Sequence, residues 1–75
     1  MSSRETAGAV RVRINGEERV LSPSMSVADL LKDLGISVPR VAVEFNREIL
    51  PKRSYGETLL REDDRIEIVQ FVGGG

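Results

Sequence analysis

Apolar and polar residues alternate at the start of the chain, as in a strand that buries one face. Residues 10–14 read Val-Arg-Val-Arg-Ile, and a period of two places the three apolar side chains on the same side of a strand. The Asn15–Gly16 pair that follows is a strong hairpin signal, because both central positions of a type I′ turn need positive φ angles. We therefore expect a β-hairpin whose return strand covers about residues 17–21.

Residues 26–34 carry the pattern of a short amphipathic helix. Apolar residues recur at positions i, i+3, i+4 and i+7, which form one face; they are Val27, Leu30, Leu31 and Leu34. Ser26 precedes Asp29 by three residues, a spacing typical of a capping box at a helix start. Gly35 predicts the end of the helix, because glycine adopts the left-handed conformation without steric cost. An amphipathic helix this short needs a sheet to lie on.

Two further strands are expected in the middle of the chain. Residues 41–45 read Val-Ala-Val-Glu-Phe and alternate again. Asn46–Arg47 fits a turn into a short strand at residues 48–50. Pro51 ends that strand, because proline cannot donate to a ladder.

The pattern weakens from residue 52 to residue 64 and then becomes clear again. Three apolar residues of this stretch are expected to fold under the sheet in a turn of helix and a loop; they are Tyr55, Leu59 and Leu60. The last strand is predicted over residues 65–71, with Ile66 and Ile68 facing inward.

The predicted order of strand, strand, helix, strand, short strand and strand indicates an α+β layer architecture. A hairpin, a crossing helix and a long last strand point to the β-grasp (ubiquitin-like) fold, a mixed sheet packed on one main helix. We expect a flexible N-terminal lead-in at residues 1–8, a β-grasp domain at residues 9–72 and a flexible C-terminal Gly tail at residues 73–75.

The composition of the 75 residues excludes several kinds of chemistry. The chain has no Cys and no His, so it has no thiolate nucleophile, no cysteine-based zinc site and no imidazole base. Eleven Lys and Arg nearly balance 12 Asp and Glu, which gives no basic surface for nucleic acid or a membrane. We expect a cytoplasmic protein with no bound metal or cofactor. A reactive atom, if there is one, is not on a side chain.

The last strand runs into Val72 and three glycines, which end at Gly75. Such an end can be a frayed terminus without a role. It can also be the reactive end, because an extended glycine tail enters passages too narrow for other residues. Four residues reach about 13 Å at ~3.3 Å each. The terminal carboxylate could then attack the α-phosphate of ATP to give an acyl adenylate. A sulfur nucleophile could displace AMP from this adenylate.

Over residues 10–75 the sequence resembles the ThiS family of thiamine-biosynthesis sulfur carriers. Residues 41–52 and 65–75 carry most of the resemblance, supported by residues 15–17 and 27–31. The resemblance implies a β-grasp fold and a carrier that is a co-substrate, not an enzyme. The family's terminal Gly-Gly matches Gly74 and Gly75, with Gly75 bearing the adenylate and then the thiocarboxylate.

The resemblance also implies a set of partners. An E1-like adenylating enzyme of the ThiF type uses ATP to activate the tail, and a persulfide relay supplies the sulfur. A thiazole synthase of the ThiG type then takes the sulfur. Two departures fall in the loop before the last strand: Tyr55 stands where the family often has Trp, and Asp63–Asp64 stands where it often has Gly-Asp.

The end of the last strand predicts a docking surface. If the strand is regular, Val69 and Phe71 point to the face opposite the inward isoleucines. Apolar side chains beside a reactive tail suggest a partner-binding patch, to which Val72 and Gly73 would also belong. The alternative is that the two side chains cover the sheet edge or close a second small core.

Three alternative functions stay open at this point. The first is the small, sulfur-carrying subunit of molybdopterin synthase, which shares the fold and the Gly-Gly end. The second is a ubiquitin-like protein modifier that joins Gly75 to lysines of target proteins. The third is a β-grasp interaction module whose glycine tail has no role.

Overall fold

The computed structural model describes residues 9–71, so the predictions for residues 1–8 and 72–75 lie outside the described part. The elements found there are β1 (Val10–Ile14), β2 (Glu17–Leu21), α2 (Val27–Asp33), η1 (Val38–Arg40), β3 (Val41–Phe45), β4 (Glu48–Leu50), η2 (Lys52–Ser54) and β5 (Arg65–Gln70). The short 3₁₀ helix η1 was not predicted. All the predicted strands and the main helix are present, each within a residue or two of its expected bounds.

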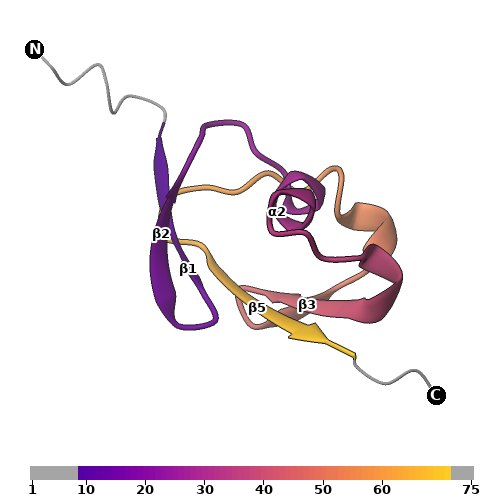
Figure 1. Cartoon of the computed structure of the whole chain (residues 1–75). Helices are drawn as coiled ribbons and strands as arrows, with labels where there is room; N and C mark the ends of the chain where they lie inside the picture. The colour runs from indigo at the N-terminus through magenta and orange to yellow at the C-terminus, as the bar shows by residue number, and fades with distance from the viewer. Residues whose placement is uncertain (1–8, 72–75) are drawn as a thin grey trace, which may run out of the picture.

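The strands form one mixed sheet in the order β2-β1-β5-β3-β4. The central strand β5 runs parallel to β1, while the other neighbouring pairs are antiparallel. Helix α2 lies on one face of the sheet (Figure 1). The arrangement confirms the predicted α+β class, with a mixed sheet packed on one main helix.

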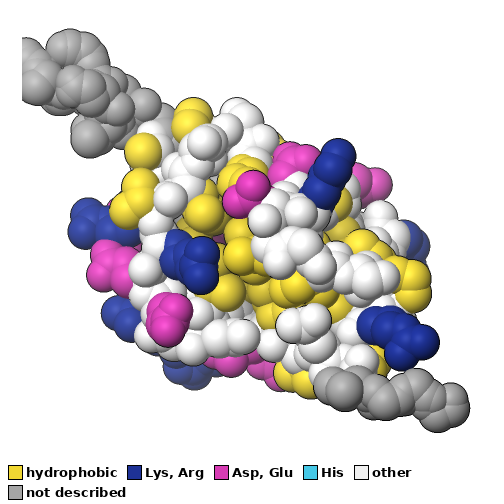
Figure 2. All heavy atoms as spheres, in the orientation of Figure 1, with side chains coloured by type: hydrophobic (Ala, Val, Ile, Leu, Met, Phe, Trp, Pro, Cys, Tyr) yellow, Lys and Arg dark blue, Asp and Glu magenta, His cyan; other side chains and the backbone are white. Residues whose placement is uncertain are grey.

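The core lies between α2 and the sheet, where Figure 2 shows hydrophobic side chains gathered with charged side chains around them. Its buried members are Val12, Ile14, Val27, Leu30, Leu31, Val41, Val43, Tyr55, Leu60, Ile66 and Ile68. Tyr55 and Leu60 therefore fold under the sheet as predicted. The expectation for Leu59 is wrong, because its side chain is 47% exposed. Successive extended residues point to opposite sides, so Leu60 faces the core and Leu59 faces outward.

Helix α2 begins with the predicted capping box. The Asp29 backbone amide donates to Ser26 Oγ at 3.0 Å, and the Ser26 amide donates to Asp29 Oδ2 at 3.0 Å. The hydrogen bonds from Ser26, first from its backbone amide, hold the pKa of the Asp29 carboxyl below its ordinary value. After the helix, Gly35 has a φ of 74°, the left-handed conformation that ends helices.

Candidate functional site

Strand β5 leads to the C-terminal residues, and an asparagine from a hairpin turn holds it on each side. From the β1 side, Ile68 N donates to Asn15 Oδ1 at 2.7 Å, and Asn15 Nδ2 donates to Ile68 O at 3.2 Å. From the β3 side, Arg65 N donates to Asn46 Oδ1 at 2.8 Å. Both asparagines have positive φ, 51° and 50°. The sequence predicted the two turns, but it gave no signal that their side chains also hold β5.

The last part of β5 extends beyond β1. The register pairs β1 with β5 at Ile14 and Ile66, whereas β3 follows β5 as far as Gln70. Phe71 N then donates to Arg40 O at 2.8 Å. The strand therefore ends one residue before its predicted end, because β3 begins only after Arg40, which belongs to η1. Figure 1 shows the end of β5 leaving the sheet beside β3.

Val69 lies on the helix-free side, as predicted, because its neighbour Ile68 faces the core, and Phe71 follows the last residue of β5. Their side chains are 56% and 54% exposed, while Ile66 and Ile68 are buried. Exposure of this extent does not fit the alternative of a closed second core. Both side chains are placed where a partner could contact them, although their binding role stays a prediction. The other predicted site residues, Val72 and residues 73–75, lie outside the described part.

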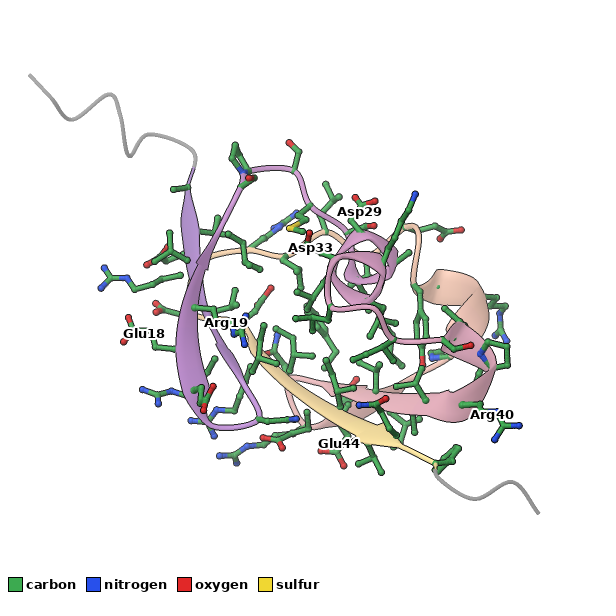
Figure 3. The ribbon with its side chains drawn as sticks, viewed as in Figure 1. Glu18, Arg19, Asp29, Asp33, Arg40 and Glu44 are labelled. Carbon is green, nitrogen blue, oxygen red and sulfur yellow. The ribbon has the colours of Figure 1, made fainter. Side chains whose placement is uncertain are left out.

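A shallow groove crosses the same helix-free face next to Val69. Its lining includes Ala42, Glu44, Ile49 and Glu67. Ala42 lies directly opposite Val69, and Glu44 lies between Ile49 on one neighbouring strand and Glu67 on the other. Figure 3 shows Glu44 on the side of the sheet away from α2. The sequence did not reveal this groove, because it depends on the register of three strands.

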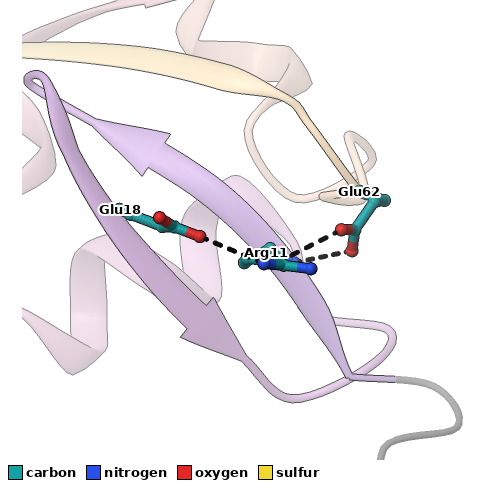
Figure 4. A network of polar contacts seen from close by, with 3 residues as sticks. All are labelled: Arg11, Glu18 and Glu62. Carbon is teal, nitrogen blue, oxygen red and sulfur yellow. Dashed lines mark hydrogen bonds and ion pairs between the residues drawn. The ribbon is translucent and has the colours of Figure 1, made fainter.

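Two carboxylates of the loop before β5, those of Glu62 and Asp64, bond to neighbouring parts of the sheet. The Arg11 guanidinium lies 3.5 Å from Glu18 and 3.5 Å from Glu62, and the Arg11 backbone amide donates to Glu62 Oε1 at 2.8 Å (Figure 4). Asp64 accepts hydrogen bonds from Arg61 N at 2.7 Å and Asn46 Nδ2 at 3.0 Å. Glu62 therefore joins the loop to β1, and Asp64 joins it to the turn between β3 and β4.

The two departures from the resemblance are accommodated locally. Asp63 has a φ of 70°, so it adopts the left-handed conformation that favours glycine. Tyr55 is buried in the core, and burial raises the pKa of its hydroxyl. Both effects concern the loop under the sheet and leave β5 unchanged.

Residues 9–71 lack a cluster of metal ligands and a membrane-spanning helix. They contain no group of three or more His, Cys, Asp or Glu side chains arranged to hold a metal ion. Nor does any helix in this part of the chain combine the length and apolarity needed to cross a membrane.

Comparison with known proteins decides the family. Residues 5–75 match the model of the ThiS family. The chain belongs to the ThiS family. A solved structure of the thiamine biosynthesis protein ThiS from Geobacter metallireducens is 29% identical, with a TM-score of 0.75 over 88% of this chain and 100% of that one. This ThiS neighbour confirms the β-grasp fold.

Two curated relatives are also similar to the chain. The sulfur carrier protein ThiS of Bacillus subtilis is 38% identical over 85% of this chain and 98% of its own length. The thiazole synthase of Paramagnetospirillum magneticum is 50% identical over 88% of this chain, but the chain spans only 20% of that protein. The chain is thus similar both to a separate sulfur carrier protein and to one fifth of a thiazole synthase.

Proposed function

We propose that this ThiS-family chain carries sulfur on the carboxyl group of Gly75 for the formation of the thiamine thiazole. The observation that carries the proposal is the position of β5. This strand lies in the centre of the sheet, is held on both sides by asparagines, and extends past β1 toward the glycine tail. A tail attached to such a strand is presented from a rigid support.

The proposed cycle begins with adenylation by a ThiF-type enzyme. A Gly75 carboxylate oxygen attacks the α-phosphorus of ATP, pyrophosphate leaves, and an acyl adenylate forms. A persulfide sulfur of the relay then attacks the carbonyl carbon, and AMP leaves. Reduction of the resulting sulfur–sulfur bond by a thiol releases the carrier as a terminal thiocarboxylate.

The composition of the chain suits a co-substrate better than a catalyst. The sequence contains no Cys and no His, the residues that most often act as nucleophile and general base near neutral pH. In the proposed cycle the partners supply the base, the sulfur nucleophile and the ATP site. The carrier supplies the carboxylate and the surface by which the partners hold it.

The sulfur acceptor is proposed to be a ThiG-type thiazole synthase. A segment similar to this chain forms a fifth of the Paramagnetospirillum magneticum thiazole synthase. Two activities joined in one polypeptide commonly act on the same intermediate, so this relative favours the thiazole pathway over the molybdopterin alternative.

Adenylation by a purified ThiF-type enzyme tests the proposal. ATP-dependent pyrophosphate release is measured with the full chain and with a chain that lacks Gly75. A chain that lacks Ser2 is the control for a one-residue deletion. We expect release with the full chain and the control, and none without Gly75. Equal release without Gly75 would contradict the proposal.

A further inference from the structure

The lining of the groove on the helix-free face falls into three bands along β5, opposed by residues of β3 and of the turn that follows it. Counted from the end nearest the tail, they are the apolar band (Ala42 and Val69), the acidic band (Glu44 and Glu67) and the basic band (Arg47 and Arg65). Successive side chains on one face of a strand are two residues apart, which is about 7 Å. The face therefore has a direction, with its apolar end beside the exit of the tail.

Among the described residues, no ion pair shorter than 4 Å joins the acidic band to the basic band. Within residues 9–71, the ion pairs shorter than 4 Å are those of Arg11 with Glu18 and Glu62. Glu44 and Glu67 lie directly opposite each other, and like charges in that position destabilise a sheet. A cation placed between the two carboxylates would remove this repulsion.

The acidic band also has an apolar border. Ile49, which lies opposite Glu44 on β4, is 71% exposed, and Val69 in the apolar band is 56% exposed. A partner that covers these side chains also removes water from the two carboxylates. A cationic side chain gains more from a carboxylate when water is excluded around it.

We infer that this face docks on the adenylating enzyme, which places an apolar side chain on the apolar band and an arginine or lysine between Glu44 and Glu67. A carboxylate of the enzyme faces the basic band. The inference rests on the proposed function, because adenylation requires that the carrier be held while its tail reaches ATP. The apolar band adjoins the tail exit, so the enzyme's matching apolar contact lies nearest its active site.

The order of the bands fixes the orientation of the docked carrier. In a reversed complex the enzyme's carboxylate would lie against the apolar band and its apolar side chain against the basic band, and covering a charge without a partner is unfavourable. The thiazole synthase is the less suitable occupant. In the Paramagnetospirillum magneticum relative, a segment similar to this chain belongs to the synthase polypeptide, and covalent linkage raises the effective concentration without a strong docking surface.

The test measures pyrophosphate release by a purified ThiF-type enzyme against carrier concentration. One double variant carries Glu44→Gln and Glu67→Gln, and a second carries Arg47→Gln and Arg65→Gln. The matched controls are Glu17→Gln and Arg19→Gln, two exposed positions on the edge strand β2. We expect each double variant to raise KM for the carrier about tenfold with kcat within about twofold, while both controls match the unchanged chain.

Thermal unfolding separates docking from folding. The double glutamine variant of the acidic band loses the repulsion between its carboxylates, so its Tm should equal or exceed that of the unchanged chain. A higher KM together with an unlowered Tm supports the docking surface. A higher KM together with a lower Tm would contradict it, because the two glutamates would then act through folding.

The remaining outcomes distinguish this inference from the proposed function. If the unchanged chain is adenylated and both double variants keep its KM, the docking inference is wrong and the proposed function stands. If the variants impair only sulfur transfer to thiazole synthase, the face belongs to that partner and the inference is wrong. If the unchanged chain is not adenylated at all, the proposed function fails first.

Discussion

Replacing Asn15 with alanine should loosen β5 at the point where it leaves β1. The substitution removes the two hydrogen bonds between the Asn15 side chain and the backbone of Ile68, of 2.7 and 3.2 Å. It also places alanine at a φ of 51°, where a Cβ is unfavourable. The effect therefore has a hydrogen-bond part and a conformational part.

The magnitude follows from these two parts. Two hydrogen bonds contribute about 1–3 kcal/mol together, and the strained φ adds about 1 kcal/mol. Asn15→Ala should thus lower the free energy of unfolding by about 2–4 kcal/mol, which in a domain of this size lowers Tm by about 10–25 °C. Asn15→Gly tolerates the φ angle, so it should lose mainly the hydrogen-bond part.

The two variants are compared by urea unfolding, which gives the free energy of unfolding, and by amide hydrogen exchange, which reports the local opening of β5. Both should show faster exchange at the Ile68 amide, and Asn15→Ala should be the less stable of the two. If Asn15→Gly unfolds within about 0.5 kcal/mol of the unchanged chain, the side-chain hydrogen bonds do not support β5 and the reasoning is refuted.

Four further predictions concern the helix ends and the loop under the sheet. Ser26→Ala should cost about 1 kcal/mol in urea unfolding. Because the pKa of Asp29 is lowered in the fold, the stability contributed by its carboxylate is present above about pH 4 and lost as the pH falls through the folded pKa. An Asp29→Asn variant whose free energy of unfolding lies below that of the unchanged chain by the same amount at pH 7 and pH 2.5 would contradict this. Gly35→Ala should cost about 1 kcal/mol, because φ is 74° there although space is open; an unchanged Tm would refute that reading. Because burial raises the pKa of Tyr55, the contribution of its neutral hydroxyl to stability is complete below about pH 10 and is lost as the pH rises through the folded pKa. Tyr55→Phe should therefore make Tm fall less steeply with rising alkaline pH. The same fall of Tm with pH in the variant and the unchanged chain would count against this.

Local patterns predicted the elements of this fold well, because their signals lie within a few residues. The hairpin at Asn15–Gly16 and the capping box at Ser26 depend only on neighbouring residues, and both have the expected geometry. Period-two alternation also predicted that Val69 would be exposed beside buried Ile68. Leu59 was misplaced because residues 52–64 have no regular period to assign its direction.

Long-range pairing could not be predicted in the same way. The hydrogen bonds between Asn15 and Ile68 join residues 53 positions apart, and nothing near Asn15 indicates them. The facing pair of Glu44 and Glu67 likewise requires the register of β3 on β5. The sequence therefore predicted the exposed side chain near the end of β5, while the support of that strand and the groove beside it required the structure.

The most direct test of the central claim is the intact mass of the protein after incubation with ATP, a persulfide sulfur source and a ThiF-type enzyme. The account predicts a mass increase that corresponds to one oxygen replaced by sulfur, located at Gly75 by fragmentation. The same incubation without ATP is the control and should leave the mass unchanged. An unchanged mass with an enzyme of verified activity, or a modification on a residue other than Gly75, would contradict the claim that this chain carries sulfur on its terminal carboxyl group.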